Sequence, residues 1–328
     1  MYKPITKVKI LMQMDFKEKI IENKNSIIGG LFLIFSLFLF LSANDAKVKK
    51  EQKIFQDRNQ EISRKVVDYE SILKTIEAKS FYVYDILGEE AIFFRDEHKQ
   101  LPLASITKLI SGMVVLDVMP ENTIITISRE DIAMEGDSGL YVGEKWKLKD
   151  LLDFSLMTSS NDGMHAVSSA LNNYQNINDT DTVRIMNERV ALLGLEDTVF
   201  INETGLDVDK SISGSYSSAH DVSIILGKLV KDYPSLIYDT GLDIKEFISE
   251  SNLKHIASNT NISVNSIPNI IASKTGFTDL AGGNLAVVFD AGFMRPISVV
   301  VLGSSRDGRF SDIITLVNLT LEKITEKF

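Results

Sequence analysis

The chain of 328 residues contains no cysteine, which excludes disulfide bonds, thiolate nucleophiles and cysteine-ligated metals. Histidine is also scarce: the four residues are His98, His165, His220 and His255, and no two of them are four positions apart. That spacing supports neither a helical pair of metal ligands nor a Ser-His-Asp triad. The 35 Lys and Arg are outnumbered by 45 Asp and Glu, whereas phosphate binding needs a basic surface. We therefore expect no metal, no cofactor and no nucleic-acid partner.

The rest of the composition is that of an ordinary globular protein. Hydrophobic residues make up 44% and charged residues 24% of the chain. These fractions exclude overall disorder and a polytopic membrane protein. A chain of this length can enclose the core of one large domain.

One uncharged segment near the start predicts a membrane anchor. Residues 25–44 carry no charge, and Ile27 to Leu41 read IIGGLFLIFSLFLFL. A helix of ~20 residues spans roughly 30 Å, the thickness of a hydrocarbon core. The lysines in 1–24 favour a cytoplasmic tail, and the lysines that follow the segment weaken that preference. We expect an uncleaved, single-pass signal anchor, because the preceding segment is long for a signal peptide; cleavage near Ser42 is the alternative.

Residues 45–79 have the pattern of a helical stalk. Apolar side chains recur at heptad-like spacing within a charged segment. They are Val48, Phe55, Ile62, Val66, Tyr69, Leu73 and Ile76. Because Gln52 and Asn59 occupy two positions of the same stripe, only a weak dimer through the stalk is suggested. The alternative is a helix that lays this stripe on the following domain.

The segment 80–328 predicts a domain of mixed helices and strands. Strands are expected first, at Phe81–Ile86 and Ala91–Phe94. Helices are expected next, at Ile106–Val118, Leu148–Met157, Met164–Leu171, Val183–Leu193 and Val222–Val230. Strands return at Phe247–Ser249, Ile270–Lys274, Leu285–Asp290 and Ile297–Leu302, before a closing helix at Ser311–Ile324. This order predicts an α+β fold in which both chain ends build one antiparallel sheet, flanked by helices, with a helical lobe inserted.

Three short motifs carry the chemistry, and only their context selects them. Ser-x-x-Lys occurs at Ser71, Ser105 and Ser251; Ser-x-Asn occurs at Ser42, Ser159 and Ser263; Lys-Thr-Gly occurs once, at Lys274. Catalysis by these three motifs requires the first serine at a helix start, the second motif in a loop between helices and the third on an edge strand, in that order. Only the set Ser105, Ser159 and Lys274 satisfies this order.

Ser105 and Lys108 are candidates for a nucleophile and its base. At i and i+3 of a helix start the two side chains share one face. A lysine that is withdrawn from water can have its pKa lowered enough to accept the serine proton. The alternative for an isolated match is that Ser105 caps the helix and Lys108 is solvated.

The other two motifs predict substrate contacts. Ser159 can serve as a second hydroxyl in a proton relay, and the Asn161 amide can bind a substrate carbonyl. The alternative for each of Ser160, Asn161 and Asp162, taken alone, is that it caps the following helix. In the strand IIASKTG, Lys274 supplies positive charge and Thr275 a hydroxyl for a carboxylate. Gly276 leaves space for a substrate backbone along the strand edge. An ordinary β-turn would explain the glycine but not the lysine.

Longer blocks around these motifs resemble the low-molecular-weight penicillin-binding proteins, the D-alanyl-D-alanine carboxypeptidases of peptidase family S11. The blocks cover roughly Phe81 to Phe328. They read LASITKLISGMVVLD, LMTSSNDGMHAVSSAL, MNERVALLGLEDTVFINETGLD, YSSAHDVSIILGKLV and ASKTGFTDLAGGNLAVV. The resemblance implies a β-lactamase/transpeptidase-like fold, a peptidoglycan stem peptide as substrate and β-lactams as covalent inhibitors. It also implies a bacterial cell membrane location with the catalytic domain outside.

The resemblance also implies a role for each motif residue. Ser105 would be the acylated nucleophile, Lys108 its general base and Ser159 the proton relay to the leaving D-alanine. Substrate would be bound by Asn161, Lys274, Thr275, Gly276, Phe277 and Arg306. The backbone N–H groups of Ser105 and Phe277 would form the oxyanion hole. Asp207 matches an acidic position of the family, for which we expect a structural role.

The chain departs from the family pattern in two ways. Ser160 stands where the family usually has glycine, and the chain stops after the closing helix, so attachment to the membrane is expected from the N-terminal side. Two rival functions remain. A serine β-lactamase would need a base for fast deacylation, and Glu196 and Glu203 lie in the right interval without a recognisable motif. A non-catalytic β-lactam receptor would acylate without turnover.

Overall fold

The computed structural model describes residues 49–50, 52–53, 68–174 and 181–326. The chain divides into two units, Met1–Asp68 and Tyr69–Phe328. In the first unit, Lys49, Lys50, Gln52 and Lys53 are helical and exposed. The predicted anchor at 25–44 and most of the predicted stalk lie outside the described residues. Within the described ranges, every helix is too short or too polar to cross a membrane.

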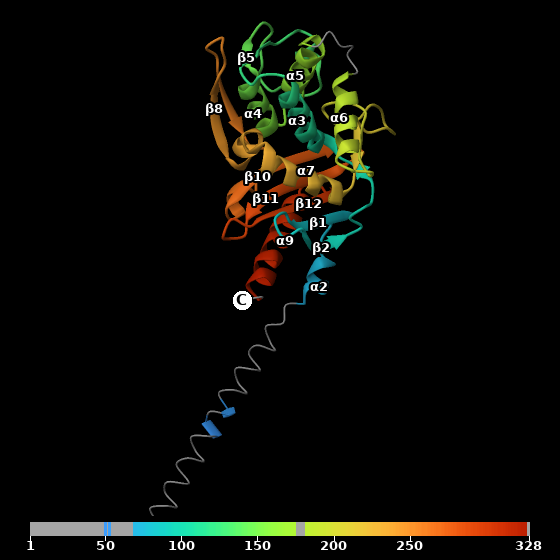
Figure 1. Cartoon of the computed structure of the whole chain (residues 1–328), viewed down its shortest axis with the longest axis vertical. Helices are drawn as coiled ribbons and strands as arrows, with labels where there is room; N and C mark the ends of the chain where they lie inside the picture. Colours follow the sequence, from blue (N-terminus) through green and yellow to red (C-terminus); the bar gives the residue numbers. More distant parts are fainter. Residues whose placement is uncertain (1–48, 51, 54–67, 175–180, 327–328) are drawn as a thin grey trace, which may run out of the picture. The chain divides into compact units, whose positions relative to one another are not determined.

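The second unit is built on a five-stranded antiparallel sheet with the strand order β10-β11-β12-β1-β2 (Figure 1). Its strands are β1 (Ser80–Asp85), β2 (Glu90–Arg95), β10 (Ile270–Thr278), β11 (Gly282–Asp290) and β12 (Pro296–Ser304). Runs such as SVVVL in β12 favour strands because β-branched side chains pack well on a pleated surface. Phe81 of β1 pairs with Val301 of β12. The prediction that both chain ends share one sheet is therefore confirmed.

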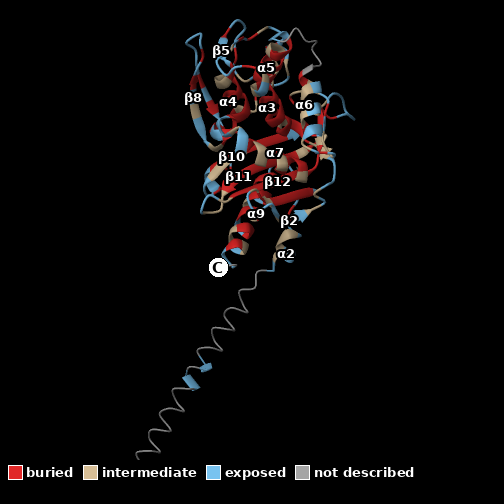
Figure 2. Ribbon diagram, viewed as in Figure 1, coloured by how far each residue is buried: buried red, intermediate tan, exposed pale blue. Residues whose placement is uncertain are grey.

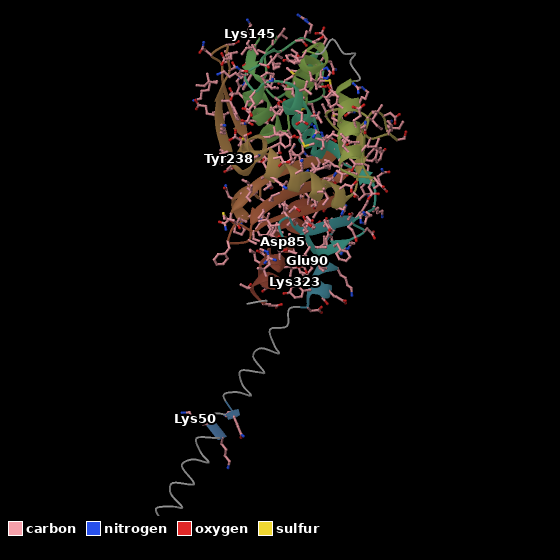
Figure 3. All side chains as sticks on the ribbon, in the orientation of Figure 1. Lys50, Asp85, Glu90, Lys145, Tyr238 and Lys323 are labelled. Carbon is pink, nitrogen blue, oxygen red and sulfur yellow. The ribbon has the colours of Figure 1, made fainter. Side chains whose placement is uncertain are left out.

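Helices cover both faces of this sheet. α7 (Ala219–Asp232) packs on β1 and β12, and α9 (Gly308–Thr325) packs on β11 and β12. Val300 and Leu302 of β12 belong to the core that α7 shares with the helical lobe. No residue of α9 belongs to that core, so α9 covers the opposite face of the sheet. Buried residues accordingly fill both sides of the sheet (Figure 2). Lys323 of α9, labelled in Figure 3, donates a hydrogen bond to the Ile92 carbonyl of β2 at 2.9 Å.

The predicted helical lobe is present, and α3 lies inside it. The lobe contains α3 (Lys108–Val118), α4 (Leu148–Thr158), α5 (Asn161–Tyr174) and α6 (Asp181–Leu192), drawn in green and yellow-green in Figure 1. Every residue from Lys108 to Val115 is buried, so the first two turns of α3 are enclosed on all sides. A helix that is buried all round belongs to the core rather than to the surface. The first residue of this core helix is therefore a buried lysine.

Shorter elements complete the domain, and one of them corrects the predicted strand order. They are α2 (Tyr69–Leu73), α8 (Pro234–Ile237), β3 (Leu101–Pro102), β4 (Ile124–Thr126), β5 (Lys145–Lys147), β6 (Val199–Phe200), β7 (Ser215–Ser217), β8 (Ile244–Ile248) and β9 (Lys254–Ser258). The predicted strand around Phe247 pairs only with β9 and does not join the central sheet. Burial alternates along this strand, because only one face is covered, by the Phe154 ring of α4 and the Trp146 ring.

The compact unit begins within the segment that was predicted to be the stalk. The Tyr69 ring of α2 lies 5.4 Å from the Phe93 ring of β2, centroid to centroid, and Ile76 is buried. Main-chain N–H groups of Glu77 and Ala78 donate to the Asp312 carboxylate of α9 at 3.0 and 2.9 Å. These contacts attach the residues before β1 to the closing helix.

Candidate active site

Ser105 lies in a 3₁₀ turn (Ala104–Thr107) directly before α3, not in the first α-helical turn. Asn284 of β11 fixes the backbone just before this turn. Its side-chain amide donates to the carbonyls of Pro102 and Leu103 at 2.9 and 3.0 Å. A 3₁₀ turn has three residues per turn, so side chains at i and i+3 eclipse. Lys108 therefore stands directly beside Ser105, with 2.7 Å between its Nζ and the serine Oγ.

The residue before Ser105 is held in a strained conformation by neighbouring backbone. Ala104 has φ +50°, a region that residues with a Cβ rarely occupy. A Cβ on Gly205 would lie 2.0 Å from the Ala104 carbonyl oxygen, and a Cβ on Gly276 would lie 2.6 Å from that of Leu103. We expected Gly276 to make room for substrate. The structure shows that the glycine also lets the Leu103 carbonyl approach β10, and space for a substrate backbone stays a prediction.

Replacing Gly205 with alanine is expected to lower the free energy of unfolding by about 3 kcal/mol, because Ala104 and Ser105 must move. Gly194→Ala is the matched control, since Gly194 also has positive φ, at +71°, but no atom lies within 4 Å of an added Cβ. Urea unfolding of both variants measures the difference. Equal losses of stability would show that the contact with Ala104 does not matter.

The Lys108 ammonium is fully buried and has three partners. Besides Ser105, Nζ donates to the Asn161 side-chain oxygen at 2.6 Å and to the Thr204 carbonyl at 2.9 Å. Burial lowers the pKa of Lys108 to about 7, against the opposing attraction of the nearby acids Glu203 and Asp162. A lysine in this state is neutral in a substantial fraction of molecules at neutral pH and can accept a proton.

The loop between α4 and α5 brings the second motif to the same place. Ser159 ends α4 in the left-handed region, with φ +61°, and its Oγ accepts a hydrogen bond from Lys274 Nζ at 2.8 Å. The Asn161 side chain links Lys108 to the Glu135 carbonyl, to which it donates at 2.6 Å. Ser160 is buried, and its Oγ accepts from the Gly163 N–H at 2.8 Å. The serine that replaces glycine here therefore caps α5.

The third motif lies on β10, an edge strand of the sheet. Lys274 is 1% exposed, and burial, followed by the nearby charges of Lys108 and Arg309, holds its pKa well below the ordinary value. The Thr275 and Thr260 hydroxyls lie 2.6 Å apart. The structure thus forms two hydrogen-bonded pairs of a serine hydroxyl with a buried lysine, Ser105 with Lys108 and Ser159 with Lys274.

Of the two arginines in the segment SSRDGRF, the structure buries the one that the sequence did not single out. Arg309 donates to the Gly276 carbonyl at 2.7 Å, and burial lowers its pKa to about 10. Its Nε has no hydrogen-bond partner. Arg306 is exposed and lies over the Phe277 ring, 5.0 Å from the centroid. Arg309 follows the buried Gly308 at the start of α9, a position that apolar periodicity does not mark.

A cavity of about 510 Å³ adjoins the end of β10. Its lining comes from Glu135, Leu206, Asp207, Asp209, Lys210, Phe277, Thr278, Asp279 and Leu280. Asp207 accepts hydrogen bonds from the Thr278 hydroxyl and the Leu280 N–H, at 3.0 and 3.2 Å. These contacts support the structural role expected for this aspartate. The catalytic and substrate-binding roles of the motif residues stay predictions.

The sequence of this chain matches that of a known protein family. The pattern of the Peptidase S11 family, described as D-alanyl-D-alanine carboxypeptidase, matches residues 64–305. The chain therefore belongs to this family of serine peptidases, to which the low-molecular-weight penicillin-binding proteins belong, and the resemblance inferred from its motifs is confirmed.

Individual relatives cover the same part of the chain. D-alanyl-D-alanine carboxypeptidase DacF of Bacillus subtilis (strain 168) is 26% identical over 75% of this chain and 63% of its own length. The D-alanyl-D-alanine endopeptidase of Pseudomonas aeruginosa is 31% identical over 65% of this chain and 67% of its own. Penicillin-binding protein D2 of Listeria monocytogenes, solved in its ampicillin-bound form, has a TM-score of 0.64 at 23% identity, covering 75% and 98% of the two chains. The match thus spans less than two thirds of DacF.

Proposed function

We propose that this protein is a membrane-anchored, serine-type D-Ala-D-Ala carboxypeptidase that removes the terminal D-alanine from peptidoglycan stem pentapeptides outside the cell membrane. The observation that carries the proposal is the pairing of the Ser105 hydroxyl with a fully buried lysine, 2.7 Å away. Membership of the S11 family supports the substrate class. The uncharged segment 25–44 supports the anchor.

The contacts of the site suggest the order of proton transfers. Neutral Lys108 accepts the Ser105 proton while the serine oxygen attacks the carbonyl carbon of the penultimate D-alanine. The terminal D-alanine leaves with a proton passed through Ser159, and an ester remains on Ser105. Water then hydrolyses the ester, which releases the shortened peptide and restores the serine. A β-lactam would acylate the same serine as its four-membered ring opens, and the resulting ester would block the site.

Positive charge at the site suits a substrate that ends in a carboxylate. The Lys274 side chain and the Thr275 hydroxyl can donate hydrogen bonds to it, and the buried Arg309, which donates to the Gly276 carbonyl, supplies positive charge. The exposed Arg306 over Phe277 can reach a ligand only from the rim of the site. We assign the carboxylate contact to Lys274 and Thr275, and to Arg309 the task of supporting β10.

One set of assays separates the candidate activities. We expect the purified chain to release D-alanine from a stem pentapeptide, to form one adduct per chain with penicillin, and to hydrolyse nitrocefin slowly. Fast nitrocefin turnover would instead identify a β-lactamase, and an adduct without D-alanine release would identify a receptor. A cross-linked stem-peptide dimer is the further substrate to include, because one relative is named an endopeptidase. Cleavage of the dimer alone would overturn the proposed carboxypeptidase.

A further inference from the structure

The loop that carries Thr204 is fastened to α3 at two adjacent carbonyls. Ser111, one turn after Lys108, donates from its Oγ to the Glu203 carbonyl at 2.6 Å, and Lys108 donates to the Thr204 carbonyl at 2.9 Å. Side chains at i and i+3 of a helix lie on one face. The backbone of Glu203 is therefore fixed beside the same face of α3 that holds the predicted base.

The Glu203 side chain is a buried anion. Its carboxylate is 13% exposed, and Oε1 lies 2.8 Å from Nδ1 of His165 on α5. Burial raises the pKa of Glu203, but the His165 hydrogen bond, a backbone hydrogen bond and the charges of His165 and Lys108 outweigh it and hold the pKa below its ordinary value. Glu203 therefore carries a negative charge over the whole pH range in which Lys108 titrates.

Few other charges face Lys108. Asp162, at the start of α5, is the second acid that favours its protonated form, and it accepts hydrogen bonds from Ser160, from the Gly163 N–H and from the Ser138 N–H. Lys274 on β10 is the other lysine of the site, and the charge of Lys108 helps to hold its pKa well below the ordinary value. Around Glu203 itself, His165 is the direct partner, and an oxygen of the buried Asp131 lies 4.0 Å from the other nitrogen of His165.

Glu203 and its partners face a cavity of their own. Asp131, His165 and Glu203 line a cavity of about 660 Å³ with residues of β4 and α5. None of its lining residues is shared with the cavity beside β10. Lys108 binds the carbonyl of Thr204, the residue after Glu203, and the negative charge of Glu203 raises the pKa of Lys108, while the Glu203 carboxylate itself is bound to His165. This arrangement does not suit a base for deacylation.

We propose that Glu203 is a positioning residue for acylation: its fixed negative charge, held behind Lys108 by Ser111 and His165, sets how readily Lys108 gives up its proton. The inference rests on the proposed function. Its consequence is a compromise, because a lysine without this carboxylate would be neutral at lower pH but would also be a weaker base. Glu203 therefore makes Lys108 a stronger base, and it lowers the fraction of molecules in which Lys108 is neutral at acidic pH.

The test is the pH dependence of the rate constant for acylation by a fluorescent penicillin. In the unchanged protein we expect the rate to rise with pH through a midpoint near the pKa of Lys108, at about 7. In Glu203→Gln the midpoint should fall by roughly one pH unit, and the plateau at high pH should also fall. Glu203→Asp retains the charge and should retain the midpoint. Glu196→Gln, which removes an exposed carboxylate, is the control and should change neither value.

Each outcome decides one question. A midpoint that stays at the original pH in Glu203→Gln, with only the plateau lowered, would overturn the inference and leave Glu203 a purely structural residue. An unchanged protein that forms no adduct at any pH would overturn the proposed function instead. Thermal unfolding checks that each variant is folded. If the glutamine variant is not folded, Glu203→Met provides a second neutral side chain, for which the same fall in midpoint is expected.

Discussion

Ser105→Ala should abolish covalent labelling by fluorescent penicillin and release of D-alanine, while the melting temperature changes by only a few degrees. Alanine has no oxygen with which to form the ester. The substitution removes one hydrogen bond from a half-buried side chain, which is worth about 1 kcal/mol. Gel fluorescence, mass spectrometry of the penicillin-treated protein and thermal unfolding measure the three quantities.

The chain supplies its own control for this experiment. Ser251 also begins a Ser-x-x-Lys sequence, but it lies in the turn between β8 and β9, where its Oγ accepts a hydrogen bond from the Lys145 N–H at 2.9 Å. Ser251→Ala should label like the unchanged protein. A mass increase that persists in Ser105→Ala would place the nucleophile elsewhere, and mapping the modified peptide would locate it.

Lys108→Met should reduce the acylation rate constant by about 10²- to 10⁴-fold, the usual contribution of a general base. Methionine matches the length of lysine and leaves the surrounding core filled, but it cannot accept the Ser105 proton. Lys108→Arg sharpens the experiment, because arginine keeps the positive charge and cannot lose its proton at these pH values. If Lys108 acts as a base, both variants fail. An active arginine variant would show that the site needs only a positive charge.

A matched lysine variant tests for general effects of losing a positive charge. Lys254 is the partner of Ser251 in the second Ser-x-x-Lys sequence, is 59% exposed and pairs with Glu246. Lys254→Met should leave acylation unchanged. Stopped-flow measurement of labelling gives the rate constants, and circular dichroism establishes that the variants are folded.

The order of the strands and helices was predictable because it follows from hydrophobic periodicity. Valine-rich runs predicted β11 and β12, and apolar residues spaced three and four positions apart predicted α3 to α7. The strand near Phe247 was misplaced because a short apolar run does not say which sheet it joins. Its pairing with β9 depends on contacts with α4 and Trp146, which are distant in sequence.

The candidate site was predictable where a motif fixes local geometry. Ser105 and Lys108 are three residues apart, so their contact follows from a helical turn of either kind. The contact of Ser159 with Lys274 depends on the whole fold, and the sequence predicted only that the two residues belong to one site. Arg309 was missed because nothing in the sequence separates a buried arginine from an exposed one three residues away. Contact with the Gly276 carbonyl distinguishes them.

The pairing of β1 with β12 also bears on how the domain folds. Ser80 lies opposite Leu302, so the first strand of the sheet finds its partner only after most of the domain has been synthesised. Contacts so distant in sequence impose a loop-closure entropy before they contribute stability, which slows folding. The Ser105 turn depends on the same late strands, through Asn284 of β11 and Gly276 of β10. An incomplete chain is therefore expected to carry its serine in an unreactive form until the last strand has joined the sheet.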